Sequence, residues 1–521
     1  MSDERGRPWT RRRFLTAAGG LLVAGTTIGA IYEALRTTGG AAPGPSPSPM
    51  VLGVNTGPAS PAASGAAPGV SYHSRPDLSP PHVDIDIPAG SVAPGLVFLT
   101  PNNGAGEAGP TIVDNDGELV WMLPVRGRSV TDFRVATYRG QPVLVWWEGA
   151  VNGGIGSGDC VIADTSYRQI ARISAGDGRT VDLHEFQITP EGTALFFADA
   201  GARPPAAAIA APSPAGSPPA SPSVLDCAIQ EVDIATGRLL WEWHAIDHIA
   251  VDETYVKAPS TDKDLFDYVH TNSISIEPDG NLLVSARNTS AVYKVDRSTG
   301  AIVWRLGGRR SDFRFGPGAT FGWQHDVRRQ ADGTITMFDD ESPPVPARAL
   351  VLRVDEGART AQLVRSFTRP QPNLVSSQGN VQALANGNLF VGWGSTPFCS
   401  EFDPSGRVVF DATFPSAVQS YRDFRFEWVG EPTDLPTMAL APAGSGLTVY
   451  ASWNGATQLA SWEVLAGPDG GHLGTVASAV RAGFETAIHV TTDQPVVAVR
   501  ALDESGRILG TSATMSPALA G

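Results

Sequence analysis

Three side chains that can bind or react with an anion occupy matching places in three predicted β-hairpins. Each hairpin has alternating apolar and polar residues on both sides of a Glu-Gly or Asp-Gly turn. The residue seven positions before the turn is His184 in the first hairpin, Asn272 in the second and His325 in the third. We therefore expect hydrogen-bonding side chains from distant parts of the chain to meet at one place.

The same turns predict which residues face one another across each hairpin. If each turn is centred on its two residues, three pairs follow: His184 with Asp199, Asn272 with Arg287, and His325 with Asp340. His270 precedes Asn272 by two residues and so lies on the same face of its strand. A three-residue turn with a bulge would shift this register by one residue and turn the side chains to the other face.

These residue types suit the binding and transfer of an anionic group. Near neutral pH an imidazole is mostly unprotonated, and it can act as a nucleophile or as an acid and base. The planar guanidinium of Arg287 can bind two oxygens of one anion. Asn272 and His270 add hydrogen-bond donors. The sequence therefore predicts an anion pocket that contains reactive imidazoles.

The hairpins belong to a pattern that recurs between residues 71 and 432. A turn and a short apolar strand are followed by an Asp, a Thr-Gly pair and a strand with a Trp. The two clearest copies are Asp233, Thr236, Gly237 and Trp241, and then Asp296, Thr299, Gly300 and Trp304. Repeats of roughly 50 residues are typical of propeller blades. We therefore expect an all-β fold in which residues 71–432 form a β-propeller catalytic domain.

The remaining residues, 433–521, contain short alternating strands separated by Gly and Asp turns. This spacing predicts a small β-sandwich like fibronectin type III.

The first residues of the chain predict export. Arg11, Arg12 and Arg13 precede Phe14 and an apolar run of small residues. This pattern resembles a twin-arginine signal over residues 1–38, which acts as a membrane anchor if it is not cleaved. We therefore expect an extracellular or cell-envelope protein.

Two segments are too poor in apolar bulk to pack into a core. Residues 39–70 and 202–223 consist mostly of Ala, Pro, Gly and Ser. We expect the first to be a disordered linker and the second a disordered insertion in the propeller.

Charge and cysteine content exclude some classes of function. The net charge is −15, so no basic field is available to hold a nucleic acid. Cys160, Cys227 and Cys399 lack the spacing of a metal site, and the sequence does not choose a disulfide pair among them.

The motifs that carry the site residues closely resemble the bacterial arylsulfotransferase (aryl sulfate sulfotransferase) family. They are HTN at residues 270–272, SARN around Arg287, WRLGG at 304–308 and WQHD to FDD at 323–340. YHSRPDLSPP, VLVWWEG and SYRDFRFEW extend the resemblance over most of the chain. The resemblance implies a six-bladed propeller that transfers a sulfuryl group from an aryl sulfate ester to a phenolic acceptor. No cofactor, metal or nucleotide donor is implied.

The resemblance also implies roles for the site residues. A histidine is transiently sulfated in such enzymes, and the matching position is His325. Arg287, Asn272 and His270 would then bind sulfuryl oxygens, while His184 or His270 passes a proton between the phenols. Asp340 would determine which ring nitrogen of His325 carries the proton. We also expect an aryl ring to stack on Trp323.

One position departs from the family pattern, and a second has two candidate residues. Where relatives commonly carry an asparagine after the Phe-Asp pair, this chain has Asp340, which either orients His325 or repels the sulfate. A small hydroxyl residue from a later blade corresponds to Ser376 or Ser377.

Two other functions fit parts of the pattern. His184, His270 and His325 could instead be the ligands of a metal-dependent ester hydrolase, although Arg287 would repel the cation. Alternatively, the chain is a non-catalytic cell-envelope propeller that binds an anionic ligand.

Overall fold

The computed structural model describes residues 69–203, 224–259, 265–341, 345–371 and 374–517. These residues form an all-β structure, which confirms the predicted fold class. The expected signal segment 1–38, linker residues 39–68 and insertion residues 204–223 lie outside the described residues. Within the described ranges, no helix is long and apolar enough to cross a membrane.

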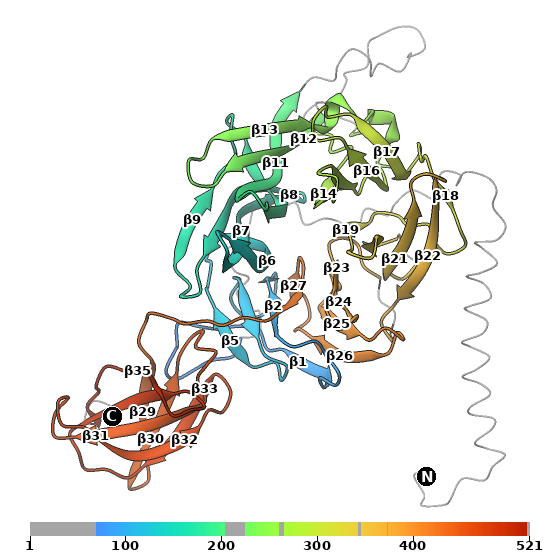
Figure 1. Cartoon of the computed structure of the whole chain (residues 1–521). Helices are drawn as coiled ribbons and strands as arrows, with labels where there is room; N and C mark the ends of the chain where they lie inside the picture. The colour runs from blue at the N-terminus through green and yellow to red at the C-terminus, as the bar shows by residue number, and fades with distance from the viewer. Residues whose placement is uncertain (1–68, 204–223, 260–264, 342–344, 372–373, 518–521) are drawn as a thin grey trace, which may run out of the picture.

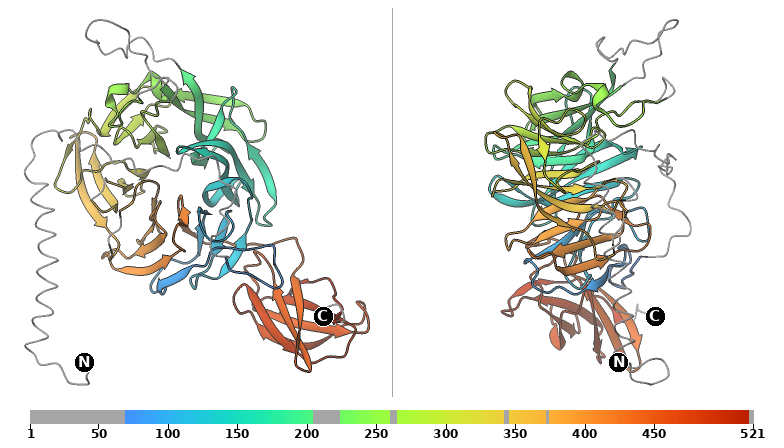
Figure 2. Two further views of the ribbon diagram at one scale, coloured as in Figure 1. Left: turned by 180° about the vertical axis from the view of Figure 1, so that it is seen from behind. Right: turned by 90° about the vertical axis from the view of Figure 1, so that its right-hand side faces the viewer.

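Most strands form antiparallel sheets that follow one another round a ring, as in a β-propeller (Figure 1). Seen edge-on, the ring is a flat disc (Figure 2). Strands from the two ends of the propeller share sheets, and this sharing closes the ring. One closing sheet contains β28 (Phe424–Phe426), β2 (Leu96–Leu99), β4 (Thr111–Val113) and β5 (Leu119–Met122). Another begins with β1 (Asp84–Ile87), which pairs with β26 (Val408–Thr413).

The next sheet is the largest and has eight strands. Its first half is β6 (Ser129–Tyr138), β7 (Gln141–Asn152), β8 (Ile155–Ala163) and β9 (Gln169–Ile173). Its second half is β10 (Thr180–Ile188), β11 (Thr193–Arg203), β12 (Val224–Asp233) and β13 (Leu239–His244). Because β10 also pairs with β8, hydrogen bonding joins two neighbouring four-stranded units into one sheet. The expected number of six blades therefore stays a prediction.

The rest of the ring consists of one four-stranded sheet and two five-stranded sheets. After the short helices η2 (Ala245–Asp247) and η3 (Val251–Glu253), one sheet contains β14 (Thr271–Ile276), β15 (Leu282–Ala286), β16 (Ala291–Val295) and β17 (Ile302–Gly307). The next contains β18 (Arg314–Phe315), β19 (His325–Arg329), β20 (Thr334–Asp339), β21 (Arg348–Asp355) and β22 (Thr360–Phe367). The last unit is β23 (Asn380–Ala383), β24 (Leu389–Gly392) and β25 (Phe398–Phe402), which pair onward to β26 and β1. A small sheet pairs β3 (Pro101–Asn102) with β27 (Gln419–Ser420).

The C-terminal part is a two-sheet sandwich beside the ring (Figure 1). One sheet is β29 (Thr437–Ala443), β30 (Gly446–Ser452) and β33 (Glu485–Val490), and the other is β32 (Gly474–Val480), β31 (Ser461–Gly467), β34 (Val496–Leu502) and β35 (Ile508–Thr511). Both contribute to one buried core around Trp462, with Val449 and Ile488 from the first sheet and Val499 from the second. The likeness to fibronectin type III stays a prediction.

The sandwich is attached to the ring by specific hydrogen bonds. The amide of Asn454 pairs with the backbone N–H and carbonyl of Met122, at 3.1 and 3.0 Å. The Tyr167 hydroxyl donates to the carbonyl of Gly455 at 2.8 Å. The two parts of the chain therefore have a defined contact.

The hairpin register differs from the prediction because each turn contains three residues instead of two. In the second hairpin, Glu277 and Asn281 pair across the turn and Gly280 adopts a φ of +82°. The same bonding occurs at the turns that end in Gly192 and Gly333. A three-residue turn of this kind moves the register by one residue.

Bulges near the start of the inner strands shift the register further. Asp199 pairs with Thr180, whereas His184 lies in an irregular stretch between the paired residues Val181 and Phe186. Asn272 occupies a bulge, so its predicted pairing with Arg287 is wrong. The strand partner of His325 is Phe338. The predicted strand pairs were therefore wrong in all three hairpins.

Cys160, Cys227 and Cys399 are buried free thiols on the separate strands β8, β12 and β25. The structure therefore forms no disulfide among them.

The inner strands are joined at the ring's centre by a buried network of ion pairs. The fully buried Arg422 donates to Asp132 at 2.8 Å and lies 3.4 Å from Glu185. Arg134 binds Glu185 at 2.8 Å, and Arg328 binds the same carboxylate at 2.6 Å. Burial acts to raise the pKa of Glu185, but the positive charges of the three arginines outweigh burial and lower this pKa. We name Asp132, Glu185, Asp326, Arg134, Arg328 and Arg422 the central ion network.

Replacing Arg422 with methionine should destabilise the protein severely. The substitution leaves Asp132 and Glu185 buried with less compensating charge, which costs about 3–5 kcal/mol in comparable buried pairs. Urea denaturation followed by tryptophan fluorescence measures the change. Arg407→Met is the control, because Arg407 forms an exposed ion pair with Asp403 and its loss should change stability far less. Equal losses in the two variants would contradict a structural role for the network.

Candidate functional site

The site lies where β10, β14 and β19 begin at one end of the ring's centre. The His184 ring packs edge-on against the His270 ring, with centroids 4.7 Å apart and planes at 83°. The charges of Arg287, His184 and His270 all act on His325 and help to lower its pKa, after burial. The structure thus brings together four of the expected residues. We name this group, His184, His270, Arg287 and His325, the histidine mouth.

His325 is almost completely buried and is bonded at both ring nitrogens. Its Nδ1 lies 2.5 Å from Oδ2 of Asp340. The backbone N–H of Gln378 donates to Nε2 at 3.3 Å. Because a backbone N–H can only donate, Nε2 carries no proton, and the ring proton lies at Nδ1. The lone pair of Nε2 is therefore available for nucleophilic attack once the hydrogen bond from the Gln378 N–H is broken.

Asp340 provides the orienting contact that the hairpin argument assigned to it. Its side chain reaches His325 from just beyond the end of β20, although Phe338 is the strand partner. Burial raises the pKa of Asp340 well above its usual value, while the charge of Arg287 opposes the rise. The ionised form of Asp340 accepts the hydrogen bond from Nδ1 and so orients the ring of His325.

The pKa of His325 is lowered well below its usual value of 6.5. Burial is the largest cause, and the nearby charge of Arg287 is the next. The ring is therefore neutral at physiological pH, which is the form that a nucleophilic imidazole requires.

Two further carboxylates hold the other histidines, and neither was identified from the sequence. Asp182 bonds to Nδ1 of His184 and also accepts its backbone N–H at 3.0 Å. Asp267 contacts Nδ1 of His270 at 2.5 Å and accepts that residue's backbone N–H at 2.9 Å. The spacings Asp-x-His and Asp-x-x-His were a usable signal, because an aspartate often accepts a backbone N–H two or three residues later.

Asp199, the expected partner of His184, instead lies beside Asp182. Burial and the charges of Asp182, Asp267 and Asp226 raise the pKa of Asp199 well above its usual value, and it shares a hydrogen bond with Asp182. Burial also lowers the pKa of His184, although Asp182 opposes this effect. Asp199, Asp182 and His184 thus form a buried hydrogen-bonded chain, and the lowered pKa of His184 keeps its ring neutral.

Arg287 is positioned to bind an anion at the histidine mouth. Its guanidinium donates to the Ser376 carbonyl at 2.9 Å and to Oδ1 of Asn288 at 3.1 Å. Its Nε is buried and has no hydrogen-bond partner among the described residues. Trp323 lies against the guanidinium, 4.9 Å from Cζ to the ring centroid, so one face of this ring supports Arg287. An oxyanion would satisfy the free Nε.

Asn272 is close to the mouth but its donor is already used. Its Nδ2 donates to the backbone carbonyl of Gln324 at 2.8 Å. The backbone carbonyl of Asn272 accepts a hydrogen bond from Arg422 at 2.8 Å. Only Oδ1 has no partner among the described residues. Asn272 therefore positions the segment that leads into His325.

Several residues around the mouth have an unusual backbone conformation. His270, Trp323, Asp326 and Gln378 all have φ between +52° and +73°, a region that non-glycine residues rarely adopt. Such strain persists only where surrounding contacts enforce it, and it commonly occurs at functional sites.

Metal binding has no support in the ranges that the structure describes. There, no group of three His, Cys, Asp or Glu side chains is arranged to hold an ion. Each mouth histidine instead directs Nδ1 to a carboxylate.

The closed ring of antiparallel sheets defines the class as a β-propeller. The arylsulfotransferase (ASST) family model matches residues 134–415, and the chain belongs to this family. All six residues expected at the site lie within the match. No curated protein matches this chain.

Solved structures resemble the chain only distantly. A protein of unknown function from Bacteroides caccae has 14% identity and a TM-score of 0.40, over 64% of this chain and 98% of that one. Virginiamycin B lyase from Staphylococcus aureus, in a catalytically inactive form with quinupristin, has 10% identity and a TM-score of 0.34. The match covers 71% of this chain and 96% of that one.

Removing the charge of Arg287 should raise the pKa of His325. The nearby guanidinium disfavours the imidazolium, so Arg287→Gln makes protonation easier while burial is unchanged. An NMR titration of 13C-labelled histidines, with His325→Gln for assignment, measures the shift. Arg309→Gln, whose side chain lies over Tyr255, serves as the control. An unchanged or lower pKa in Arg287→Gln would contradict the proposed proximity.

Proposed function

We propose that this protein transfers a sulfuryl group from an aryl sulfate ester to a phenolic acceptor, through a transient sulfohistidine at His325 and without a nucleotide donor. One observation carries the proposal: a buried, neutral imidazole presents an unprotonated Nε2 next to a guanidinium that has a free Nε. A sulfate monoester requires this combination of a nucleophile and fixed positive charge. Membership of the arylsulfotransferase family supports the same chemistry.

In the first step, Nε2 of His325 attacks the sulfur and the bond from sulfur to the phenolic oxygen breaks. Arg287 binds the sulfuryl oxygens and holds the sulfur in place for the attack. The ring becomes positive as the N–S bond forms, and Asp340 stabilises it through Nδ1. The leaving phenolate takes a proton from a second histidine.

We assign His270 as the histidine that donates this proton. Its side chain is 15% exposed, whereas that of His184 is 7% exposed and the pKa of His184 is lowered by burial. In the second step, His270 takes the proton of the acceptor phenol, whose oxygen attacks sulfur and displaces His325. The products are the donor's phenol and the acceptor's sulfate ester, and the protein returns to its starting state.

The twin-arginine-like sequence of residues 1–38 supports a further proposal, that the protein acts outside the cytoplasm. Small phenols and aryl sulfates would reach it there without entering the cell.

The proposal predicts that His325→Ala nearly abolishes transfer. With 4-nitrophenyl sulfate as donor and phenol as acceptor, the release of 4-nitrophenol should fall by at least about 10³-fold when the nucleophile is removed. Mass spectrometry of the wild-type protein incubated with donor alone should find one added SO3 group on the peptide that contains His325.

His489→Ala is the matched control, because this exposed histidine of β33 belongs to the sandwich. Its activity should equal that of the wild type. Similar 4-nitrophenol release by wild type and His325→Ala would refute the sulfohistidine step. Binding of 4-nitrophenyl sulfate without any release would instead support the non-catalytic alternative.

A further inference from the structure

A second pocket lies at the other end of the ring's centre from the histidine mouth. The inner strands run from the mouth to this pocket: β10 carries His184 and then Gln187, and β19 begins at His325 and is followed by Gln330. In the sequence, Gln187 follows His184 by three residues, and Gln330 follows His325 by five. The pocket has a volume of about 390 Å³, and no residue of the mouth lines it. We name it the far pocket.

The central ion network lies between the mouth and the far pocket. Asp132, Glu185 and Arg422 are fully or almost fully buried, and their ion pairs fill the centre of the ring. Asp326 and Arg328 of the network also line the far pocket. A ligand in the far pocket would thus be separated from the sulfuryl site by a layer of side chains.

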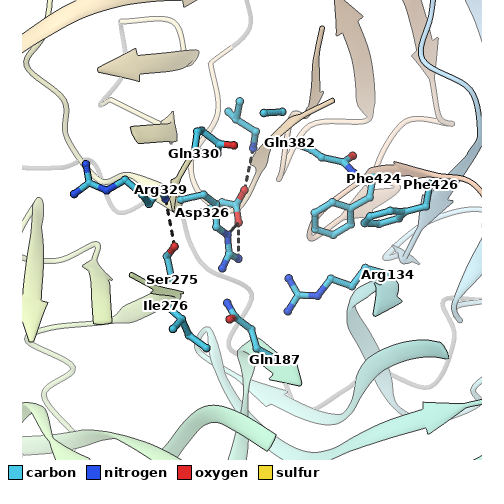
Figure 3. Close-up of a pocket in the computed structure, with 13 residues that line it drawn as sticks. Arg134, Gln187, Ser275, Ile276, Asp326, Arg329, Gln330, Gln382, Phe424 and Phe426 are labelled. Carbon is cyan, nitrogen blue, oxygen red and sulfur yellow. Dashed lines mark hydrogen bonds and ion pairs between the residues drawn. The ribbon is translucent and has the colours of Figure 1, made fainter. Parts of the chain in front are cut away.

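Arg134 offers the far pocket free N–H donors of its guanidinium. One terminal nitrogen, Nη2, binds Glu185 and the Phe186 carbonyl and lies 3.2 Å from Asp132. The other terminal nitrogen and Nε make no hydrogen bond within the part of the chain that the structure describes. The side chain is 13% exposed, and Figure 3 shows its guanidinium reaching into the pocket. In Arg328, by contrast, all three guanidinium nitrogens donate hydrogen bonds, to Asp326, to Glu185 and to a backbone carbonyl.

Aromatic rings and amide oxygens complete the lining. Phe424 and Phe426 lie side by side, with centroids 5.7 Å apart, above the space that Arg134 enters (Figure 3). The Nε2 group of Gln187 donates a hydrogen bond to Glu185, and that of Gln330 donates one to Thr336. Their Oε1 atoms have no donor among the described residues and face a pocket that both side chains line. Small-molecule sites typically combine apolar walls with a few such polar groups.

We propose that the far pocket binds a small aromatic anion, with its ring against Phe424 and Phe426 and its charged group on the free terminal nitrogen of Arg134. A carboxylate or a sulfate ester can accept a charge-assisted hydrogen bond from this nitrogen. The amide oxygens of Gln187 and Gln330 favour a ligand that also has a hydroxyl or amine on the ring. This site does not depend on the proposed sulfuryl transfer, which uses the other end of the ring.

Binding of 4-fluorobenzoate, followed by 19F NMR on the full chain, tests the proposal. This probe has neither a phenol nor a sulfuryl group, so the protein cannot convert it. We expect saturable binding to the wild type, and at least tenfold weaker binding of 4-fluorobenzyl alcohol, which lacks the charge. Fluoroacetate, which lacks the ring, should also bind at least tenfold more weakly. A parallel titration of His325→Ala with 4-fluorophenyl sulfate shows whether a sulfate ester binds as well as a carboxylate.

Two variants locate the probe. Arg134→Gln removes the charge and Phe426→Leu removes the flat ring, and each should weaken 4-fluorobenzoate binding at least tenfold. Arg287→Gln, which alters only the histidine mouth, should bind as the wild type does. If Arg134→Gln does not fold, Phe426→Leu and the ligand series decide the question. Absence of saturable binding, or binding that Arg287→Gln abolishes and Phe426→Leu leaves intact, would overturn the proposal.

Discussion

The central ion network is the interaction on which the rest of the structure depends. Arg422, from the last part of the propeller, bonds to Asp132 on β6, to the Asn272 carbonyl on β14 and to Glu185 on β10. Arg422 and Asp132 lie nearly 300 residues apart in the sequence, so this bond joins the two ends of the propeller. Charges buried this deeply are stable only when each has a partner, because desolvation penalises every unpaired one. Bringing these partners together requires the closed ring, so closure of the ring and pairing of the charges support each other.

The same closed ring allows the histidine mouth to hold unfavourable conformations. Bulges interrupt β10, β14 and β19 near their starts, and His270 and Asp326 adopt left-handed backbone angles. An isolated hairpin would relax into regular pairing, since each such residue costs of the order of 1–3 kcal/mol. Here the aspartates that accept both a backbone N–H and an imidazole Nδ1 stabilise the bulged strands. Local strain thus directs the imidazoles to the centre.

The electrostatics of the two ends of the ring differ, although both ends use arginine. At the mouth, burial and Arg287 keep His325 neutral while leaving a positive group for the anion. At the far pocket, Glu185 and Asp132 neutralise much of the guanidinium charge, and only Nε and Nη1 of Arg134 have no hydrogen-bond partner among the described residues. The first arrangement suits an anionic group that reacts with a neutral imidazole. The second suits reversible binding of a small anion beside aromatic rings.

The sequence by itself determined the all-β class, the positions of the turns and most residues of the mouth, because alternating polarity and Gly-containing turns are local features. It also indicated that Asp340 would contact His325, even though the register behind that pairing was wrong. Tertiary structure alone decided the bulges, the contact of Gln378 with His325, the role of Arg422 and the existence of the far pocket. These features join residues from separate sheets, and strand periodicity carries no information about which sheets become neighbours. Only closure of the ring brings them within bonding distance, and only then does burial set the protonation of His325.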